Sequence, residues 1–402
     1  MKLFFLILLP TLLCAADWPH LSGPTLDFHV AATNIGRDWQ TRPPSLLWKA
    51  ALTDDGHACA SCANDTLFIT DHLGTNDIVR ALALADGKEL WRTSYPDTFK
   101  YYHGYARATP TFHQGMIYTV SRMGLAHCLD AATGHVLWKK DFIQDLAGQA
   151  PNHGFSAPVG VWGDAAYLQP GGSNGNVVAV NKKTGALLWR GGNSEKPGYS
   201  LPVIATFDKI PTLLCHSANT LMGLNPDTGA TLWTYPRANP YGNNVAQPVI
   251  MGNRIFTGSS DYSGSTVIEI RNDQPQAVWE NKEICPLFAT PVLANSLFFV
   301  TSTLLPSNPE GLMCFDPATG KVHWKIKAFE HGQVIAADGV VLALDGQKGA
   351  LVMIDPSAEA YREITRFTPL GGRSWSTFFT VGDRLIIRNQ RELACFRLGD
   401  NR

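Results

Sequence analysis

The sequence predicts an all-β fold, an eight-bladed β-propeller of four-stranded blades, because one phrase recurs along the chain at the period of a blade. The phrase is a short apolar strand, a turn that contains glycine, and an apolar strand that ends in Trp. Five copies are clear: LALADGKELW, LDAATGHVLW, VNKKTGALLW, LNPDTGATLW and FDPATGKVHW. From Trp48 onward, the repeat tryptophans follow one another after 43, 47, 51, 44, 46 and 45 residues. Eleven Trp, 36 Gly and 25 Pro in 402 residues also indicate many short strands separated by turns.

The first residues have the pattern of an export signal. Lys2 precedes an apolar run from Leu3 to Leu13, and Cys14 is followed by two alanines. The run is too short to cross a bilayer and ends in small residues, so we expect residues 1–16 to be a cleaved signal peptide. The mature protein is then periplasmic or secreted, without a transmembrane segment. Lipoprotein anchoring at Cys14 is the less favoured alternative, because Leu13 stands where a small residue is expected.

The repeat phrase has a physical reading. Asp-x-x-Thr-Gly forms a tight hairpin, because Gly accepts positive φ and Asp bonds its own backbone. The large apolar face of the Trp then seals one blade against the next. A degenerate copy, IRNDQPQAVW, carries Pro275 in place of glycine, and IDPSAEAYRE puts Tyr361 near the Trp position. The tryptophans expected to dock the blades are Trp48, Trp91, Trp138, Trp189, Trp233, Trp279 and Trp324.

The two ends of the repeat region complement each other. The last blade has three expected strands, at residues 374–379, 383–389 and 391–398, whereas residues 46–49 form a lone Trp-bearing strand. We therefore expect the N-terminal strand to complete the last blade, which removes an open edge. Residues 17–44 are a lead-in segment, and residues 45–398 are expected to form a single propeller domain.

Composition and cysteines limit the classes of function. The net charge is −1 and charged residues make up 17% of the chain, so no nucleic-acid partner is expected, and we expect a monomer. Cys128, Cys314 and Cys395 share one position of their repeats, which indicates buried packing. Cys59 and Cys62 lack the His that haem attachment requires and the second ligand pair that zinc requires. A strained disulfide and two packed thiols both stay open for them, and we favour the thiols.

Polar and aromatic residues cluster just before the first strand of several blades. Because the innermost strands of a propeller surround its channel, these segments should converge on one mouth and form a ligand pocket. The alternative for each residue is a cap on its strand. No metal site is expected, and the stretch from Asp261 to Ser265 is expected to be a turn. The candidate ligand-binding residues are His57, His103, Tyr105, Arg107, His153, Tyr199, Asn243, Asn244, Phe288, His331 and Trp375.

The repeat at this spacing resembles the pyrroloquinoline-quinone (PQQ) dehydrogenase-like propeller repeat from residue 45 to residue 398. The mature start, DWPHLSGPTLDFH, resembles the lead-in of exported propellers of this type. The family includes quinone-dependent alcohol dehydrogenases and an outer-membrane-assembly scaffold lipoprotein. The resemblance implies a possible PQQ between an adjacent Cys-Cys disulfide and a Trp, with calcium held by Glu, Asn and Asp.

This chain departs from that quinone site. No two of its cysteines are adjacent, no Glu stands in the channel segments, and the long insertions that roof a cofactor are missing. Trp375 could serve as the stacking floor and Asn243 or Asn244 as an oxygen ligand. PQQ and calcium are thus disfavoured. We expect a non-catalytic module that binds an unknown small ligand or protein partner at the channel mouth. A divergent quinoprotein-like oxidoreductase is the alternative, and a carbohydrate hydrolase, which needs paired acids, ranks last.

Overall fold

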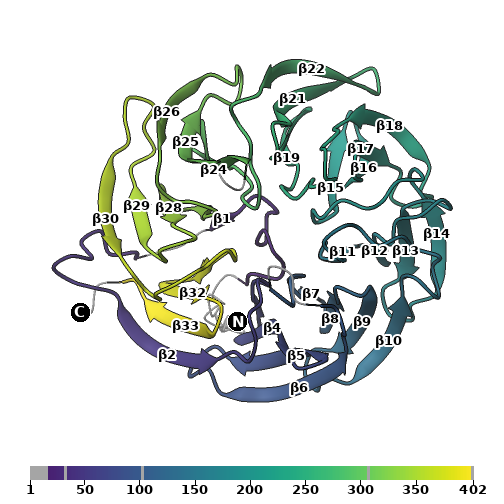
Figure 1. Ribbon diagram of the computed structural model, residues 1–402, viewed down its shortest axis with the longest axis horizontal. Coiled ribbons are helices and arrows are strands. Elements are labelled where there is room, and N and C mark those ends of the chain that lie inside the picture. The colour runs from purple at the N-terminus through teal and green to yellow at the C-terminus, as the bar shows by residue number, and fades with distance from the viewer. Residues whose placement is uncertain (1–16, 31–33, 101–103, 306–307, 400–402) are drawn as a thin grey trace, which may run out of the picture.

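A computed structural model describes residues 17–30, 34–100, 104–305 and 308–399. The regular structure of these residues is β throughout, and the strands form eight sheets arranged as blades around a common axis (Figure 1). This confirms the predicted eight-bladed propeller. No helix within the described ranges has the length and hydrophobicity to cross a membrane.

Each of the first four blades is a meander of four consecutive strands. Blade 1 holds β3 (Ser61–Ala63), β4 (Thr66–Leu73), β5 (Asn76–Ala83) and β6 (Glu89–Pro96). Blade 2 holds β7 (Thr111–His113), β8 (Met116–Val120), β9 (Leu125–Asp130) and β10 (Val136–Asp141). Blade 3 holds β11 (Gly160–Trp162), β12 (Ala165–Leu168), β13 (Val177–Asn181) and β14 (Leu187–Gly191). Blade 4 holds β15 (Val203–Phe207), β16 (Ile210–His216), β17 (Thr220–Leu224) and β18 (Thr231–Pro236).

The other four blades continue the ring, and the last two also take strands from the N-terminal region. Blade 5 holds β19 (Val249–Met251), β20 (Arg254–Ser259), β21 (Gly264–Arg271) and β22 (Gln274–Asn281). Blade 6 holds β23 (Val292–Ala294), β24 (Leu297–Leu305), β25 (Asn308–Phe315) and β26 (Val322–Ile326). Blade 7 holds β27 (Gln333–Ala337), β28 (Val340–Leu344), β29 (Leu351–Ile354), β30 (Glu363–Phe367) and the short β1 (His29–Val30). Blade 8 holds β31 (Phe379–Val381), β32 (Arg384–Arg388), β33 (Glu392–Arg397) and β2 (Ser45–Ala51).

The N-terminal strand closes the ring as predicted. β2 pairs antiparallel with β33, from Ser45 opposite Arg397 to Ala51 opposite Glu392. The pairing gives β33 a neighbour on its outer side, so blade 8 reaches the same four strands as the others. One expected boundary is wrong: the first strand of blade 8 begins at Phe379 and not at Ser374, because residues 374–378 form the loop that enters the channel mouth.

The repeat tryptophans dock each blade on the next by a hydrogen bond as well as by packing. In six blades the indole Nε1 donates to a backbone carbonyl in the hairpin turn of the following blade, at 2.9–3.0 Å. In five of these turns a Gly with positive φ lies against the indole, so that a Cβ on Gly229 would lie 2.4 Å from the Trp189 ring. The recurrence of Gly and Trp in the sequence follows from this contact. The donor and acceptor pairs are Trp48 with Leu84, Trp91 with Ala131, Trp138 with Lys182, Trp189 with Pro226, Trp279 with Pro317, and Trp324 with Ser357.

Blade 7 lacks a Trp at this position and receives one from the lead-in segment. Thr365, and not Tyr361 as expected, stands opposite Met353 in the register where other blades carry Trp. The backbone N–H of Trp39 donates to the Thr365 hydroxyl at 2.9 Å, and its buried indole packs edge-on against Phe367 at 5.1 Å. Tyr361 precedes β30 and contacts Trp324 instead.

The shared position of Cys128, Cys314 and Cys395 lies directly across the strand pair from the repeat Trp. All three thiols are fully buried, and burial raises the pKa of each to about 12. Cys59 and Cys62 are also buried and free, as the favoured interpretation of two packed thiols expects. The cysteines at this shared repeat position thus belong to the packed interior of the blades.

Residues 17–30 cross the ring at the hairpin end of the innermost strands, where Figure 1 shows the purple segment over the centre. Trp18 exchanges two backbone hydrogen bonds with Cys62 of blade 1, and the Pro19 carbonyl accepts one from blade 2. The Leu26 carbonyl accepts a hydrogen bond from Gln247 of blade 5 at 2.6 Å. β1 then pairs in parallel with β27 of blade 7. We call this stretch the plug. No repeat pattern marks it in the sequence.

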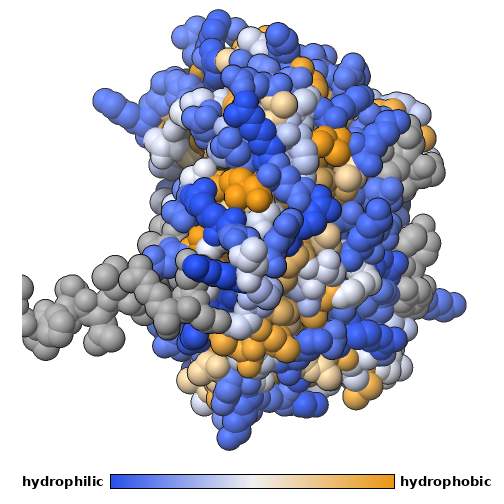
Figure 2. Space-filling model, turned by 90° about the vertical axis from the view of Figure 1, so that its left-hand side faces the viewer, coloured by the Kyte–Doolittle hydropathy of each residue, from blue (hydrophilic) through white to orange (hydrophobic). Residues whose placement is uncertain are grey.

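Figure 2 shows the outer side of the ring around β30 and β2, where no segment comparable to the plug is seen. Hydrophilic residues dominate there, and hydrophobic residues form small separate groups. Single exposed apolar residues are normal on a soluble surface.

Candidate ligand-binding site

The central channel holds a cavity of about 530 Å³. Its walls come from all eight blades, mainly from the segments that precede the innermost strands. Its floor includes Leu21 and Phe28 of the plug, which closes the hairpin end of the channel. The volume lies within the range of small-molecule pockets. Eight of the candidate residues line it: His57, Arg107, His153, Tyr199, Asn243, Phe288, His331 and Trp375.

Two candidate residues lie elsewhere, and a third, His103, falls outside the described residues. Tyr105 stacks on His72 of blade 1, with ring centroids 4.0 Å apart, so it packs behind the channel wall. The Asn244 amide donates to three backbone carbonyls, those of Ser217, Ala218 and Arg237, and is fully buried. The prediction that Asn244 binds a ligand is therefore wrong, because its side chain joins loops of blades 4 and 5.

Trp375 is already stacked on its neighbours. The imidazoles of His57 from blade 1 and His331 from blade 7 lie nearly parallel to it, with centroids 5.2 and 5.1 Å away. The Arg373 guanidinium lies 4.4 Å above the ring. Rings from both adjacent blades and one guanidinium thus already contact the indole that the sequence suggests as a stacking floor.

The wall formed by blades 8, 1 and 2 is rich in arginine. The Arg373 guanidinium donates to Asp55 at 2.7 Å, and Arg388 donates to the carbonyl of Ala58 at 3.0 Å. Burial, followed by the positive charge of Arg388, lowers the pKa of His57 to about 3, against the opposing effect of Asp55. Arg107 also contributes to this depression. His57 is accordingly neutral, and this wall is positive through its guanidinium groups.

Asp261 makes the opposite wall acidic, which the sequence interpretation missed. It lies in the four-residue turn, residues 260–263, between β20 and β21, where Asp261 and Tyr262 both have positive φ. The carboxylate is buried and accepts hydrogen bonds from Ser260 at 2.7 Å, Asn239 at 3.3 Å and Asn243 at 3.4 Å. The expected turn is present, yet it also delivers a carboxylate to the pocket. The lining therefore includes an acidic residue besides the histidines, the arginine and the aromatic rings.

The pocket does not fit PQQ and calcium. A hard cation requires several oxygen ligands, and Asp261 is the one carboxylate among the described residues that line the cavity. No group of three potential metal ligands occurs within the described residues. Trp375, the suggested stacking floor, already contacts His57 and His331. The same single carboxylate offers no pair of acids for glycoside hydrolysis.

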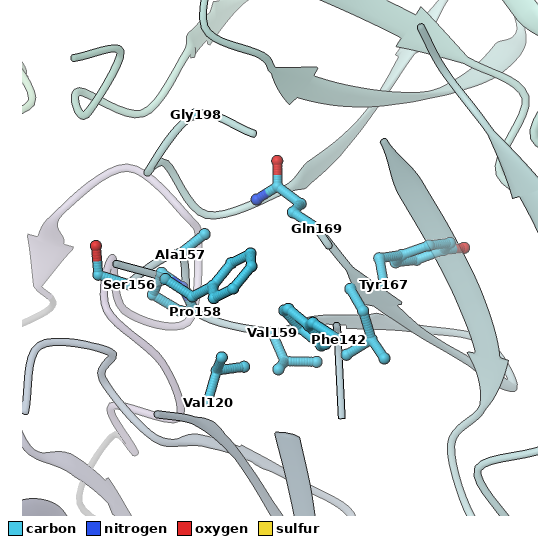
Figure 3. A pocket seen from close by; sticks show the side chains of 11 residues that line it. Val120, Phe142, Ser156, Ala157, Pro158, Val159, Tyr167, Gln169 and Gly198 are labelled. Atoms are coloured by element: carbon cyan, nitrogen blue, oxygen red, sulfur yellow. The ribbon is translucent and has the colours of Figure 1, made fainter. Parts of the chain in front are cut away.

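A second, much smaller cavity lies between blades 2 and 3 (Figure 3). Its volume of about 10 Å³ corresponds to a single water molecule. The Gln169 amide at its edge donates to the Ser200 carbonyl at 2.9 Å. Val120, Phe142 and Val159 supply much of the remaining surface, as expected for a packing gap between blades.

Comparison with known proteins shows which family this chain resembles. A family model described as outer membrane protein assembly factor BamB matches residues 75–326. The outer membrane protein assembly factor BamB of Shewanella oneidensis is 27% identical over 280 residues, which cover 66% of this chain and 67% of that protein. The match thus spans about two thirds of that relative.

Solved structures share the propeller. The crystal structure of BamB from Moraxella catarrhalis superimposes with a TM-score of 0.64 at 16% identity, over 88% of this chain and 99% of its own. Quinohemoprotein alcohol dehydrogenase from Comamonas testosteroni gives a TM-score of 0.69 at 12% identity, over 97% of this chain and 81% of its own. At such identities the likeness concerns the fold alone.

Proposed function

This chain belongs to the family of the outer membrane protein assembly factor BamB, and from that membership we propose that it is an exported, non-catalytic scaffold or ligand-binding module. We place it in the periplasm, as a monomer, after cleavage of residues 1–16. In this proposal the open mouth of the channel is the binding site, for a protein partner or a small ligand.

The blind channel carries the proposal. The plug closes one end, so that the cavity opens at the mouth formed by the loops before the innermost strands. Loops held by a rigid scaffold are where binding residues concentrate. The mouth residues differ from blade to blade, with Arg107, Tyr199 and Phe288 at comparable places. Such variation on a regular framework suits recognition of one asymmetric partner.

Site-specific photo-crosslinking in the native host tests where partners bind. A photoreactive amino acid in place of Tyr241, which is 57% exposed at the pocket mouth, is expected to form a discrete protein adduct. Trp162 is the matched control, because it is an aromatic residue 45% exposed at the opposite end of β11. Mass spectrometry should identify an outer-membrane or assembly protein in the Tyr241 adduct. Equal adducts at both positions, or an adduct at Trp162 alone, would contradict the proposed face.

The oxidoreductase alternative predicts a different result. We expect the purified protein to show no dye-linked alcohol oxidation after incubation with PQQ and calcium. The physical reasons are the stacked Trp375, the single lining carboxylate Asp261 and the absence of an adjacent cysteine pair in the sequence. A quinohemoprotein alcohol dehydrogenase assayed in parallel is the positive control. Oxidation that requires both PQQ and calcium would replace the scaffold proposal with an enzyme.

A further inference from the structure

The charged groups of the pocket lie on opposite walls. Arg107, the arginine among the described lining residues, belongs to blade 2. Arg373 does not line the cavity but packs over Trp375 in the loop before blade 8. Asp261 belongs to blade 5, which is three places from blade 2 and from blade 8 in the eight-bladed ring. A ligand that satisfies both walls must therefore carry a negative group at one end and a positive group at the other.

The Asp261 wall requires a cation. The carboxylate is only 5% exposed, and its partners within the described chain are a hydroxyl and two amides, all neutral. Burial of a carboxylate without a positive partner is costly, so an ammonium group placed beside it is favoured. The ring of Tyr241 lines the same side of the mouth and can add a cation–π contact.

Three guanidinium groups surround His57 on the arginine wall. The charges of Arg388, Arg107 and Arg373 lower the pKa of His57 and Asp55 raises it, while Asp71 also acts on Arg388. Asp55 already accepts hydrogen bonds from Arg373 and Gln390, each at 2.7 Å. A planar guanidinium binds a carboxylate with two parallel hydrogen bonds, so a ligand carboxylate is the matching group at Arg107.

Between these walls the lining is apolar. Leu287, Phe288 and Leu305 form part of one side, and Leu21 and Phe28 form the floor. A free amino acid carries both charges on one carbon, whereas Arg107 and Asp261 belong to blades three places apart in the ring. An extended peptide gains up to ~3.5 Å per residue and places apolar side chains between its charged ends.

We propose that this pocket binds a short free peptide, with its C-terminal carboxylate at Arg107, its N-terminal ammonium at Asp261 and its side chains on the apolar middle. The inference rests on the proposed use of the channel mouth as the binding site. It assigns to that site a ligand that needs both free ends, unlike a loop or tail of a partner protein.

Calorimetric titration of the full chain with trileucine tests the proposal. Trileucine amide lacks the carboxylate, and N-acetyl-trileucine lacks the ammonium. We expect trileucine to bind and each blocked form to bind about tenfold to a hundredfold more weakly, as loss of a charge-assisted hydrogen bond implies.

Two variants assign the ends of the peptide. Arg107→Gln is expected to remove the preference for trileucine over its amide while keeping the preference over the acetylated form. Asp261→Asn, which keeps a side-chain oxygen for the Ser260 hydroxyl, is expected to do the reverse. Lys183→Gln, at an exposed hairpin turn, is the charge-matched control and should change neither preference. Melting curves verify folding, and the blocked peptides on the unaltered protein carry the test if a variant fails to fold.

Three outcomes would overturn the proposal. They are equal binding of blocked and free peptides, dependence on the carboxylate alone, which indicates a protein C-terminus, and no binding at millimolar trileucine by folded protein. The cross-linking experiment separates the two proposals. A protein that keeps its Tyr241 adduct but ignores trileucine refutes the peptide assignment alone, whereas loss of adduct specificity refutes the proposed function.

Discussion

Replacement of residues 45–51 by a glycine–serine segment of equal length is expected to give an aggregating, poorly folded protein. The change removes the Trp48 indole, which is 7% exposed and donates to the Leu84 carbonyl of blade 1 at 3.0 Å. It also removes the ladder to β33 and leaves that edge open to other chains. Loss of a buried Trp alone costs about 3–5 kcal/mol, a large part of the total stability of a domain.

Size-exclusion chromatography and thermal melting measure this effect, and the equal length keeps the plug tethered. Leu46→Ala is the control in the same strand, because Leu46 is 48% exposed and should alter stability little. A monomer that melts like the unaltered protein after replacement of the whole strand would show that β2 is dispensable for closure.

Gly229→Ala is expected to be the most damaging single methyl addition in a repeat turn, with a loss of about 2–5 kcal/mol in the free energy of unfolding. Gly229 has a φ of +74°, which costs an L-residue about 1–2 kcal/mol. The new Cβ would lie 2.4 Å from Cε3 of Trp189, and overpacking adds about 1–3 kcal/mol. Relief of the clash would lift the turn from the indole and stretch the 2.9 Å bond from Trp189 to Pro226.

Gly115→Ala separates these two costs. Gly115 has a similar φ of +79°, but a Cβ there meets nothing within 4 Å. Denaturant unfolding should therefore show a loss of about 1–2 kcal/mol for Gly115→Ala and a clearly larger loss for Gly229→Ala. Equal losses at the two positions would mean that the contact between glycine and indole does not hold the blades together.

The sequence predicts the framework well because each blade repeats the same local contacts. Trp48 was placed in the last blade from the period alone, since a strand without a blade and a blade without a strand must complement each other. Five of the turns that precede a repeat Trp carry a glycine for its φ and for room under the neighbouring indole. Blade 7 lacks the repeat Trp, and the prediction that Tyr361 stands in its place failed. Trp39, from outside the repeat, supplies the missing aromatic ring.

The site was predicted in part, because position in a repeat fixes which loops meet but not where each side chain points. Asn243 and Asn244 show the limit: Asn243 lines the pocket, whereas its neighbour bonds backbone carbonyls. Asp261 was missed because its turn looks like any other hairpin turn. Leu21 and Phe28 precede all repeats, so no period indicated that they form the floor.

The plug and β2 also determine when this ring can be completed during folding. Part of their pairing joins residues far apart along the chain: Val30 of β1 lies opposite Ala337, and Ala51 of β2 lies opposite Glu392. Such non-local pairing raises contact order and slows folding. Until blades 7 and 8 form, β1 and β2 lack these pairing partners, and partly folded chains expose apolar side chains and strand edges. A chain built this way is expected to stay prone to aggregation until its last two blades have formed.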